Sequence, residues 1–238
     1  MEYGKLLDDA LHYTNDGIFS NVNRWMKLIV AIICLGIPMN GYVMRIYRGT
    51  ETAPEVDQWG TLFVDGIKLI IVGIIYAIPI MILWAFIYGG MMLSLMQGNT
   101  AMMQNWSPNL GLLLLMYLIE IIIGIIMPVA AIRFARTGSF SEAFNFSAIL
   151  ATIKQIGWLN YIIALILIAI VICIPVFIII FAFILIGGIS MYMLGGGMVA
   201  LFGFIAAAIL VLLVLMPLFG VFQARYMTRV YDSAAIET

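Results

Sequence analysis

The sequence predicts an all-α integral membrane protein in which four long helices form two transmembrane hairpins. Residues 155–224 contain no charged side chain, and residues 69–132 contain only Glu120. The chain is 65% hydrophobic and 10% charged, whereas soluble domains average about 25% charged residues. A charge at the bilayer centre costs roughly 2.5–3.5 kcal/mol, so spans kept free of charge indicate helices in lipid. No basic tail or basic face points to a nucleic-acid partner.

The N-terminal segment, residues 1–24, predicts a short amphipathic helix rather than a cleavable signal peptide. It carries Glu2, Asp8, Asp9 and Asp16 and lacks the basic, apolar and small-residue order of a signal sequence. We expect its apolar side chains to dip into the membrane interface. These are Tyr3, Leu6, Leu7, Ala10, Leu11, Ile18 and Phe19.

The first apolar segment, residues 25–48, leaves two alternatives open. Seventeen residues separate Lys27 from Arg45, and Gly36, Pro38 and Asn40 interrupt them. The segment either re-enters and returns to the same side, or crosses as a fifth helix with the N-terminus outside. Re-entrant backbone is tolerated only where protein or water covers it, and the hairpins would have to supply that cover.

Four apolar stretches predict the crossing helices, at about 67–95, 110–135, 156–187 and 197–225. Each crossing contains a proline that we expect to kink it, at Pro79, Pro128, Pro175 and Pro217. Two further helices are expected along the inner interface, over 56–67 and 137–153. Ser139 or Ser141 could cap the second of these, and Glu142 suits its first turn.

Landmarks recur in the same order along the chain, which predicts an internal duplication. Each unit has a lysine, a proline, a glycine pair, a Met-Pro step and two arginines. The predicted single transmembrane domain, 1–238, divides into the amphipathic segment 1–24, a partial repeat 25–48, repeats 49–136 and 137–229, and a tail 230–238. Parallel repeats are expected to pack around a pseudo-axis along the membrane normal.

Basic residues predict the orientation. Lysine and arginine cluster in residues 45–68 and 133–154 and near the C-terminus, whereas the turns near 96–109 and 187–197 carry none. Because cytoplasmic loops are enriched in lysine and arginine, we expect the two clusters and the C-terminus on the cytoplasmic side of the plasma membrane, and the uncharged turns outside.

Two stretches also carry a family resemblance. Residues 41–50 read Gly-Tyr-Val-Met-Arg-Ile-Tyr-Arg-Gly-Thr, and residues 57–68 read Asp-Gln-Trp-Gly-Thr-Leu-Phe-Val-Asp-Gly-Ile-Lys. They resemble a mainly archaeal family of multi-pass membrane proteins catalogued as a domain of unknown function. The resemblance implies an archaeal plasma membrane, and it assigns no functional residue.

Glu120 is the outlier of the apolar spans. An intramembrane carboxylate is by default a functional-site hypothesis. A buried acid is expected to have a raised pKa, so this side chain could carry a proton. The corresponding position of the second repeat, near Ile209, is apolar. Glu120, with Asn40, is therefore the candidate proton or cation site. The alternative is a protonated Glu120 hydrogen-bonded to backbone or to Asn40 without further function.

Three arginine pairs form the second candidate site. Their members lie three or four residues apart, so each pair projects from one helix face: Arg45 and Arg48, Arg133 and Arg136, and Arg225 and Arg229. Arginine matches phosphate geometry, so they could bind an anion or a lipid headgroup. Ordinary anchoring to anionic headgroups is the alternative. Asp57 and Asp65 are expected to pair with these arginines.

Three functions follow from these patterns. The favoured prediction is a non-enzymatic scaffold or accessory subunit of a membrane complex or homo-oligomer, surrounded by membrane lipids. The second is a small transporter or channel that uses Glu120. An intramembrane lipid enzyme is disfavoured, because no two catalytic side chains converge by spacing. No cofactor or metal is expected with His12, Cys34 and Cys173 as the only histidine and cysteines.

Overall fold

The computed structural model describes residues 1–98, 107–193 and 198–235, and every regular element in these ranges is a helix. Four of the helices are long and apolar enough to cross a membrane, which confirms the predicted all-α membrane class. Helices that are apolar on all sides, as these are, belong in lipid rather than on a soluble surface. They are α4 (Trp59–Met96), α6 (Leu110–Thr137), α8 (Trp158–Met193) and α9 (Met198–Asp232).

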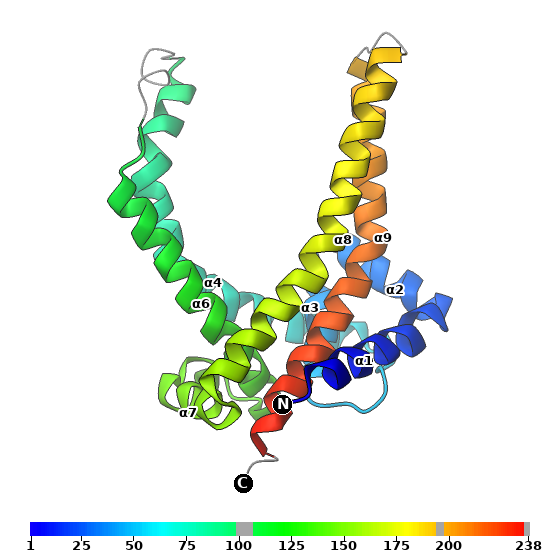
Figure 1. Cartoon of the computed structure of the whole chain (residues 1–238), viewed down its shortest axis with the longest axis vertical. Coiled ribbons are helices and arrows are strands. Elements are labelled where there is room, and N and C mark those ends of the chain that lie inside the picture. Colours follow the sequence, from blue (N-terminus) through cyan, green and yellow to red (C-terminus); the bar gives the residue numbers. More distant parts are fainter. Residues whose placement is uncertain (99–106, 194–197, 236–238) are drawn as a thin grey trace.

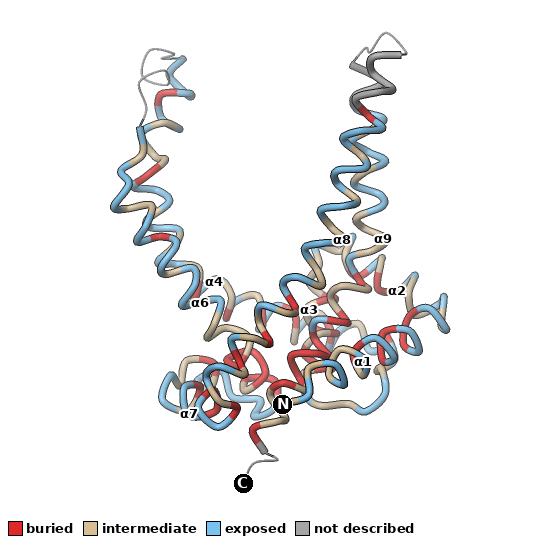
Figure 2. Tube along the Cα trace, viewed as in Figure 1, coloured by how far each residue is buried: buried red, intermediate tan, exposed pale blue. Residues whose placement is uncertain are grey.

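The four long helices form two hairpins that diverge like the arms of a V (Figure 1). Helices α4 and α6 make one arm, and α8 and α9 make the other. The arms meet at a base that also holds both chain termini and the short helices. Buried residues gather at this base, whereas the arms are mostly exposed (Figure 2). In a bilayer, lipid or another membrane protein covers such apolar arms.

The first apolar segment is a broken pair of short helices, α2 (Val22–Ile33) and α3 (Ile37–Tyr47). Leu35 and Gly36 between them adopt left-handed conformations, with φ of 60° and 68°, and Pro38 lies in the first turn of α3. Helices of 12 and 11 residues reach only about 18 Å at 1.5 Å per residue, short of a hydrocarbon core of about 30 Å. The segment is therefore not one continuous crossing helix, and its re-entry into the membrane stays a prediction.

The predicted amphipathic helix is present as α1 (Tyr3–Thr14), followed by a π-helical turn, η1 (Asn15–Phe19). It runs along the base beside α9 (Figure 1). Ala10 and Ile18 are fully buried, whereas Leu11 is 60% and Phe19 is 52% exposed. Part of the apolar face thus packs against protein, and only the remainder is available to lipid.

The two expected interfacial helices differ in outcome. The stretch 137–153 contains a 3₁₀ turn, η2 (Phe140–Phe144), and then α7 (Phe146–Ile156). The cap of α7 is Asn145, which accepts a hydrogen bond from the Ala148 amide at 3.2 Å, so the prediction of a serine cap was wrong. The separate helix expected over 56–67 is also not formed. Residues from Trp59 onward continue directly into α4, because no breaker follows the left-handed Gln58.

Helices α3 and α4 approach each other more closely than side chains normally allow. A Cβ atom on Gly41 would lie 2.0 Å from the carbonyl oxygen of Leu62, and one on Gly66 would lie 1.9 Å from that of Ile37. The two glycines therefore let the backbones of the helices touch. This contact fixes the broken pair of helices against the first arm.

Side-chain to backbone hydrogen bonds join one arm to the other and α2 to the second arm. The Tyr161 hydroxyl of α8 donates to the Ile125 carbonyl of α6 at 2.7 Å. The Trp25 indole of α2 donates to the Val214 carbonyl of α9 at 3.0 Å. Residues 99–106 and 194–197 of the predicted outer turns lie outside the described residues, whereas residues 187–193 continue α8 to Met193, so the second turn was expected to begin too early. The internal duplication stays a prediction.

Candidate functional site

The three arginine pairs all lie at the base, at the C-terminal ends of α3, α6 and α9. Each of the six guanidiniums is within ion-pair distance of a carboxylate of this chain. The pairs are Arg45 with Asp57, Arg48 with Asp65, Arg133 with Glu142, Arg136 with Asp232, and both Arg225 and Arg229 with Asp9 and Glu51. The predicted pairing of Asp57 and Asp65 with arginines is confirmed.

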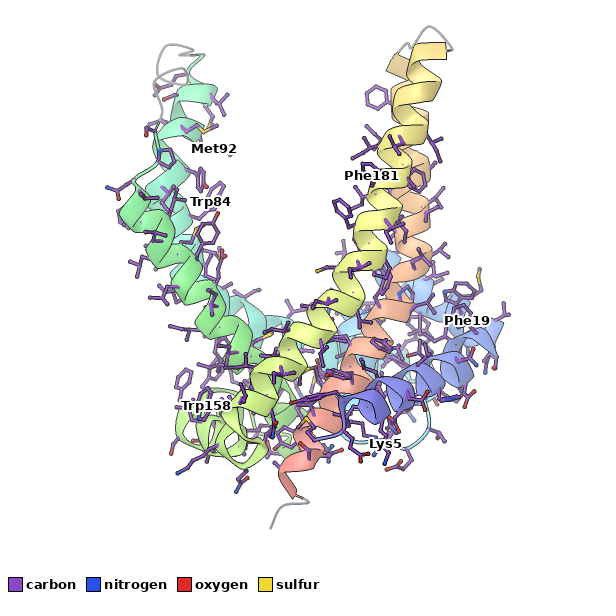
Figure 3. The ribbon with its side chains drawn as sticks, in the orientation of Figure 1. Lys5, Phe19, Trp84, Met92, Trp158 and Phe181 are labelled. Atoms are coloured by element: carbon purple, nitrogen blue, oxygen red, sulfur yellow. The ribbon has the colours of Figure 1, made fainter. Side chains whose placement is uncertain are left out.

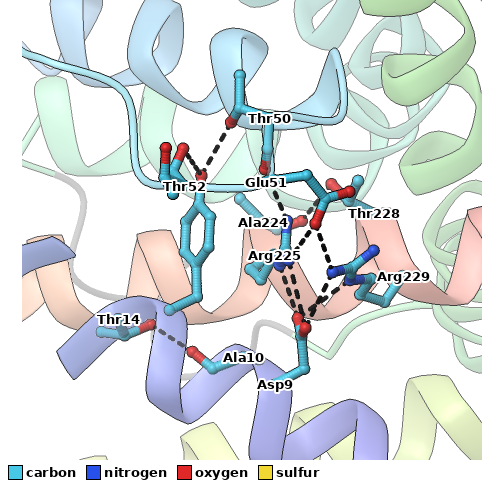
Figure 4. A network of polar contacts seen from close by, with 11 residues as sticks. Asp9, Ala10, Thr14, Thr50, Glu51, Thr52, Ala224, Arg225, Thr228 and Arg229 are labelled. Carbon is cyan, nitrogen blue, oxygen red and sulfur yellow. Dashed lines mark hydrogen bonds and ion pairs between the residues drawn. The ribbon is translucent and has the colours of Figure 1, made fainter. Parts of the chain in front are cut away.

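Arg225 is the most enclosed of the six, with a side chain 3% exposed. Its Nε donates to Asp9 of α1 at 2.6 Å, and another guanidinium nitrogen donates to the Thr50 carbonyl at 2.7 Å (Figure 4). The Tyr13 ring lies under the guanidinium, 4.4 Å from centroid to Cζ. Because Asp9 and Tyr13 of α1 and the Thr50 carbonyl of the loop after α3 converge on Arg225, this side chain fastens α1 and that loop to α9.

Arg229 lies one turn further along α9 and shares the same carboxylates. Its guanidinium donates to Asp9 at 3.0 Å and to Glu51 at 3.1 Å (Figure 4). Burial by itself raises the pKa of the Asp9 carboxyl, but the hydrogen bonds and charges of Arg225 and Arg229 outweigh it and hold the pKa below its ordinary 3.8. Asp9 is therefore ionised at neutral pH, and the cluster has paired charges.

This lowered pKa gives the fold a defined acid sensitivity. A carboxyl with a depressed folded-state pKa contributes stability above its unfolded value, and loses it as pH falls through the folded value. We expect the melting temperature in detergent to be flat above about pH 5 and to fall below about pH 4. Asp9→Asn should melt lower than the parent at pH 7, and the difference should shrink at pH 3. If the melting temperatures of the parent and Asp9→Asn differed by the same amount from pH 7 to pH 3, the lowered pKa of Asp9 would be contradicted.

The loop after α3 receives arginines from both arms. Arg136 of α6 donates through Nε to the Tyr47 carbonyl at 2.7 Å, and Arg225 of α9 donates to the Thr50 carbonyl at 2.7 Å. Gly49 between them has φ of 89°, and its Cα faces the Arg136 guanidinium. One short turn thus links the ends of the two hairpins, which explains how the arms are held at a common base.

Arg133 has a local partner. It pairs with Glu142 in the η2 turn, and Asn145 donates to the same carboxylate at 3.1 Å. These hydrogen bonds hold the pKa of Glu142 below its usual range. Glu142 lies in the first turn of η2, as predicted, and its ion pair with Arg133 anchors the connection between α6 and α7.

The structure does not bring Glu120 and Asn40 together. Glu120 lies in α6 with an exposed side chain, and it has no hydrogen-bond or ion-pair partner among the described residues. Asn40 is in α3, where its amide nitrogen donates to the Gly36 carbonyl at 2.9 Å. The suggested hydrogen bond between the two is absent from the described structure, and a proton or cation site built from both is not assembled.

Asp9, Tyr13 and Glu51 are the site residues that sequence reasoning missed. Each belongs to a polar segment that the charge pattern identified only as water-facing. An acid in the middle of an amphipathic helix, at Asp9, was the available signal. Over residues 1–98, 107–193 and 198–235, no cluster of three or more His, Cys, Asp or Glu could hold a metal ion.

Comparison with known proteins places this architecture in a family. No curated protein and no solved structure matches the chain. The family described as "Protein of unknown function (DUF4013)" matches residues 26–184, well over half of the chain. The matched region runs from α2 into α8, so it includes the broken pair α2 and α3 and the first arm, whereas α9 with Arg225 and Arg229 lies beyond it. The chain is therefore a multi-pass helical membrane protein that belongs to the DUF4013 family.

Proposed function

We propose that this protein is a non-enzymatic membrane scaffold or accessory subunit, whose two arms hold a further membrane-embedded chain. The divergence of the arms carries this proposal. In the most apolar windows of the four long helices, only 6–17% of residues are buried. Trp84 on one arm and Phe181 on the other lie on the sides that face each other (Figure 3), and they are 45% and 50% exposed.

The chemistry of the base supports the same proposal. Its arginines are engaged with carboxylates and with backbone carbonyls of this chain, an arrangement that fixes the angle between the arms. A rigid base with open apolar arms suits the binding of a second copy or of another membrane protein. Transport through Glu120 remains the alternative, and it lacks a second polar group converging on that carboxylate among the described residues.

The proposed orientation follows from the same charges. Residues 45–68, residues 133–154 and the described C-terminal end all lie at the base (Figure 1). Because lysine and arginine mark cytoplasmic loops, we infer that the base faces the cytoplasm and that the arms point outward. An archaeal plasma membrane is the proposed location.

Disulfide crosslinking in native membranes tests the scaffold. Cys34 and Cys173 are first replaced by alanine, and Trp84→Cys or Phe181→Cys is then introduced singly. We expect mild oxidation to yield adducts of twice the monomer mass, or adducts with another membrane protein, at both positions. Lys5→Cys is the matched control, because Lys5 is 81% exposed but lies on α1 at the base. A lone monomer at positions 84 and 181, with both thiols reactive towards maleimide, would refute the proposal.

A further inference from the structure

A cavity of about 520 Å³ lies between the arms near the base, lined by α3, α4, α6 and α9. Its size is in the range of 300–1,000 Å³ that small-molecule sites occupy. Its wall is mostly aliphatic, with Leu69 and Ile74 of α4, and with Met127 and Pro128 of α6. No charged residue lines it.

Three neutral polar groups interrupt this apolar wall: the Asn40 amide, the Tyr47 hydroxyl and the Gln223 amide. The Asn40 nitrogen donates to Gly36, whereas its oxygen has no partner in the described ranges of the chain. Among the described residues, the Tyr47 hydroxyl and the Gln223 amide have none either. Burial raises the pKa of Tyr47 to about 12, so its phenol stays a neutral donor at physiological pH. Asn40 and Tyr47 are half-buried and Gln223 is exposed, and polar groups that face hydrocarbon instead of water need hydrogen-bond partners, because leaving them unmet is costly.

We propose that this cavity binds a neutral glycerolipid, with its hydroxyl groups and linkage oxygens among Asn40, Tyr47 and Gln223 and with its chain along the aliphatic wall. The polar groups offer both donors and acceptors, as a glycerol head requires. An anionic headgroup would enter without a counter-charge, because every arginine pair lies outside the lining. The site is independent of the scaffold proposal, since its ligand is held within one chain.

Gly73 provides a way to fill the cavity. It lines the wall in α4, and a Cβ there would meet only the Met127 methyl carbon, at 3.6 Å, which is ordinary contact. Gly73→Leu should therefore occupy space that the ligand needs. Gly124→Leu is the matched control, because Gly124 lies in α6 outside the lining and a Cβ there meets no atom within 4 Å.

Native mass spectrometry of the full chain in a nonionic detergent tests the proposal, with 1-monooleoylglycerol and 1-oleoyl-lysophosphatidylglycerol as probes. We expect one monooleoylglycerol per chain, bound about tenfold more tightly than the anionic probe with the same acyl chain. Gly73→Leu and Gln223→Leu should each weaken it by about tenfold, and Gly124→Leu should leave it unchanged. The melting temperature of each variant reports whether it folds. If Gly73→Leu does not fold, the binding measured for Gln223→Leu decides the test.

Three outcomes would overturn the site: no saturable binding of monooleoylglycerol, binding that Gln223→Leu leaves unchanged, or equal binding of the anionic probe. The first outcome would mean that the cavity holds only water. The crosslinking result at Trp84 and Phe181 is read separately, so failure of the lipid site and failure of the scaffold are distinguishable.

Discussion

Arg225→Met should lower the free energy of unfolding by about 1.5–3 kcal/mol, because the enclosed guanidinium loses its charge-assisted hydrogen bonds while Asp9 keeps Arg229 as a partner. The substitution keeps most of the side-chain volume, but the Thr50 carbonyl loses the guanidinium donor and Asp9 loses one of its two arginine partners. We expect α1 and the loop after α3 to detach from α9. Unfolding by sodium dodecyl sulfate in mixed micelles measures the first effect, and hydrogen exchange of residues 3–14 measures the second.

Lys5→Met is the matched control for the Arg225 prediction. The Lys5–Glu2 ion pair is 81% and 68% exposed, and such surface pairs contribute only about 0–1 kcal/mol. If Arg225→Met and Lys5→Met lowered the free energy of unfolding equally, the ion pairs around Arg225 would not be stabilising the fold as proposed. Loss of stability without faster exchange in α1 would show that Arg225 supports α9 alone.

Gly66→Ala should separate α3 from α4. Its Cβ would lie 1.9 Å from the Ile37 carbonyl oxygen, and backbone atoms cannot yield as a flexible side chain can. Overpacking of this kind costs about 1–3 kcal/mol. We expect Gly66→Ala, and likewise Gly41→Ala, to lower the melting temperature in detergent and to make residues 34–36 accessible to protease.

Gly60→Ala is the control for this contact, because Gly60 is in the same helix and a Cβ there meets nothing within 4 Å. Alanine favours an exposed helix over glycine by about 1 kcal/mol, so this variant should be neutral or stabilised. If Gly66→Ala were as stable as Gly60→Ala, the close approach of the two backbones would be refuted.

The positions of the crossing helices could be predicted because charge and proline leave a clear pattern. The first crossing helix was expected to end at residue 95 and the second to begin at residue 110. These positions agree with α4, which ends at Met96, and with α6, which begins at Leu110. The start of α4 was less predictable, since Trp59 to Ile67 are neither apolar throughout nor interrupted by proline. Continuity with the membrane helix depends on packing against α3, which local sequence does not reveal.

The candidate site was only partly predictable. Helical spacing placed Arg225 and Arg229 on one face, but Asp9 lies 216 and 220 positions away along the chain. Spacing reports neighbours within a helix and says nothing about partners that folding brings together. For the same reason Glu120 and Asn40, both polar within apolar runs, were expected near each other and lie in different surroundings.

The sequence by itself determined that this is an all-helical membrane protein, with four long crossings and its basic residues in clusters. It could do so because the cost of placing charge in hydrocarbon acts on each residue separately and is visible in composition. Only the tertiary structure decided that the arms diverge, that the first segment is a broken pair docked through Gly41 and Gly66, and that the arginines face carboxylates. These features depend on distances between segments remote in the chain, and those distances are set by packing.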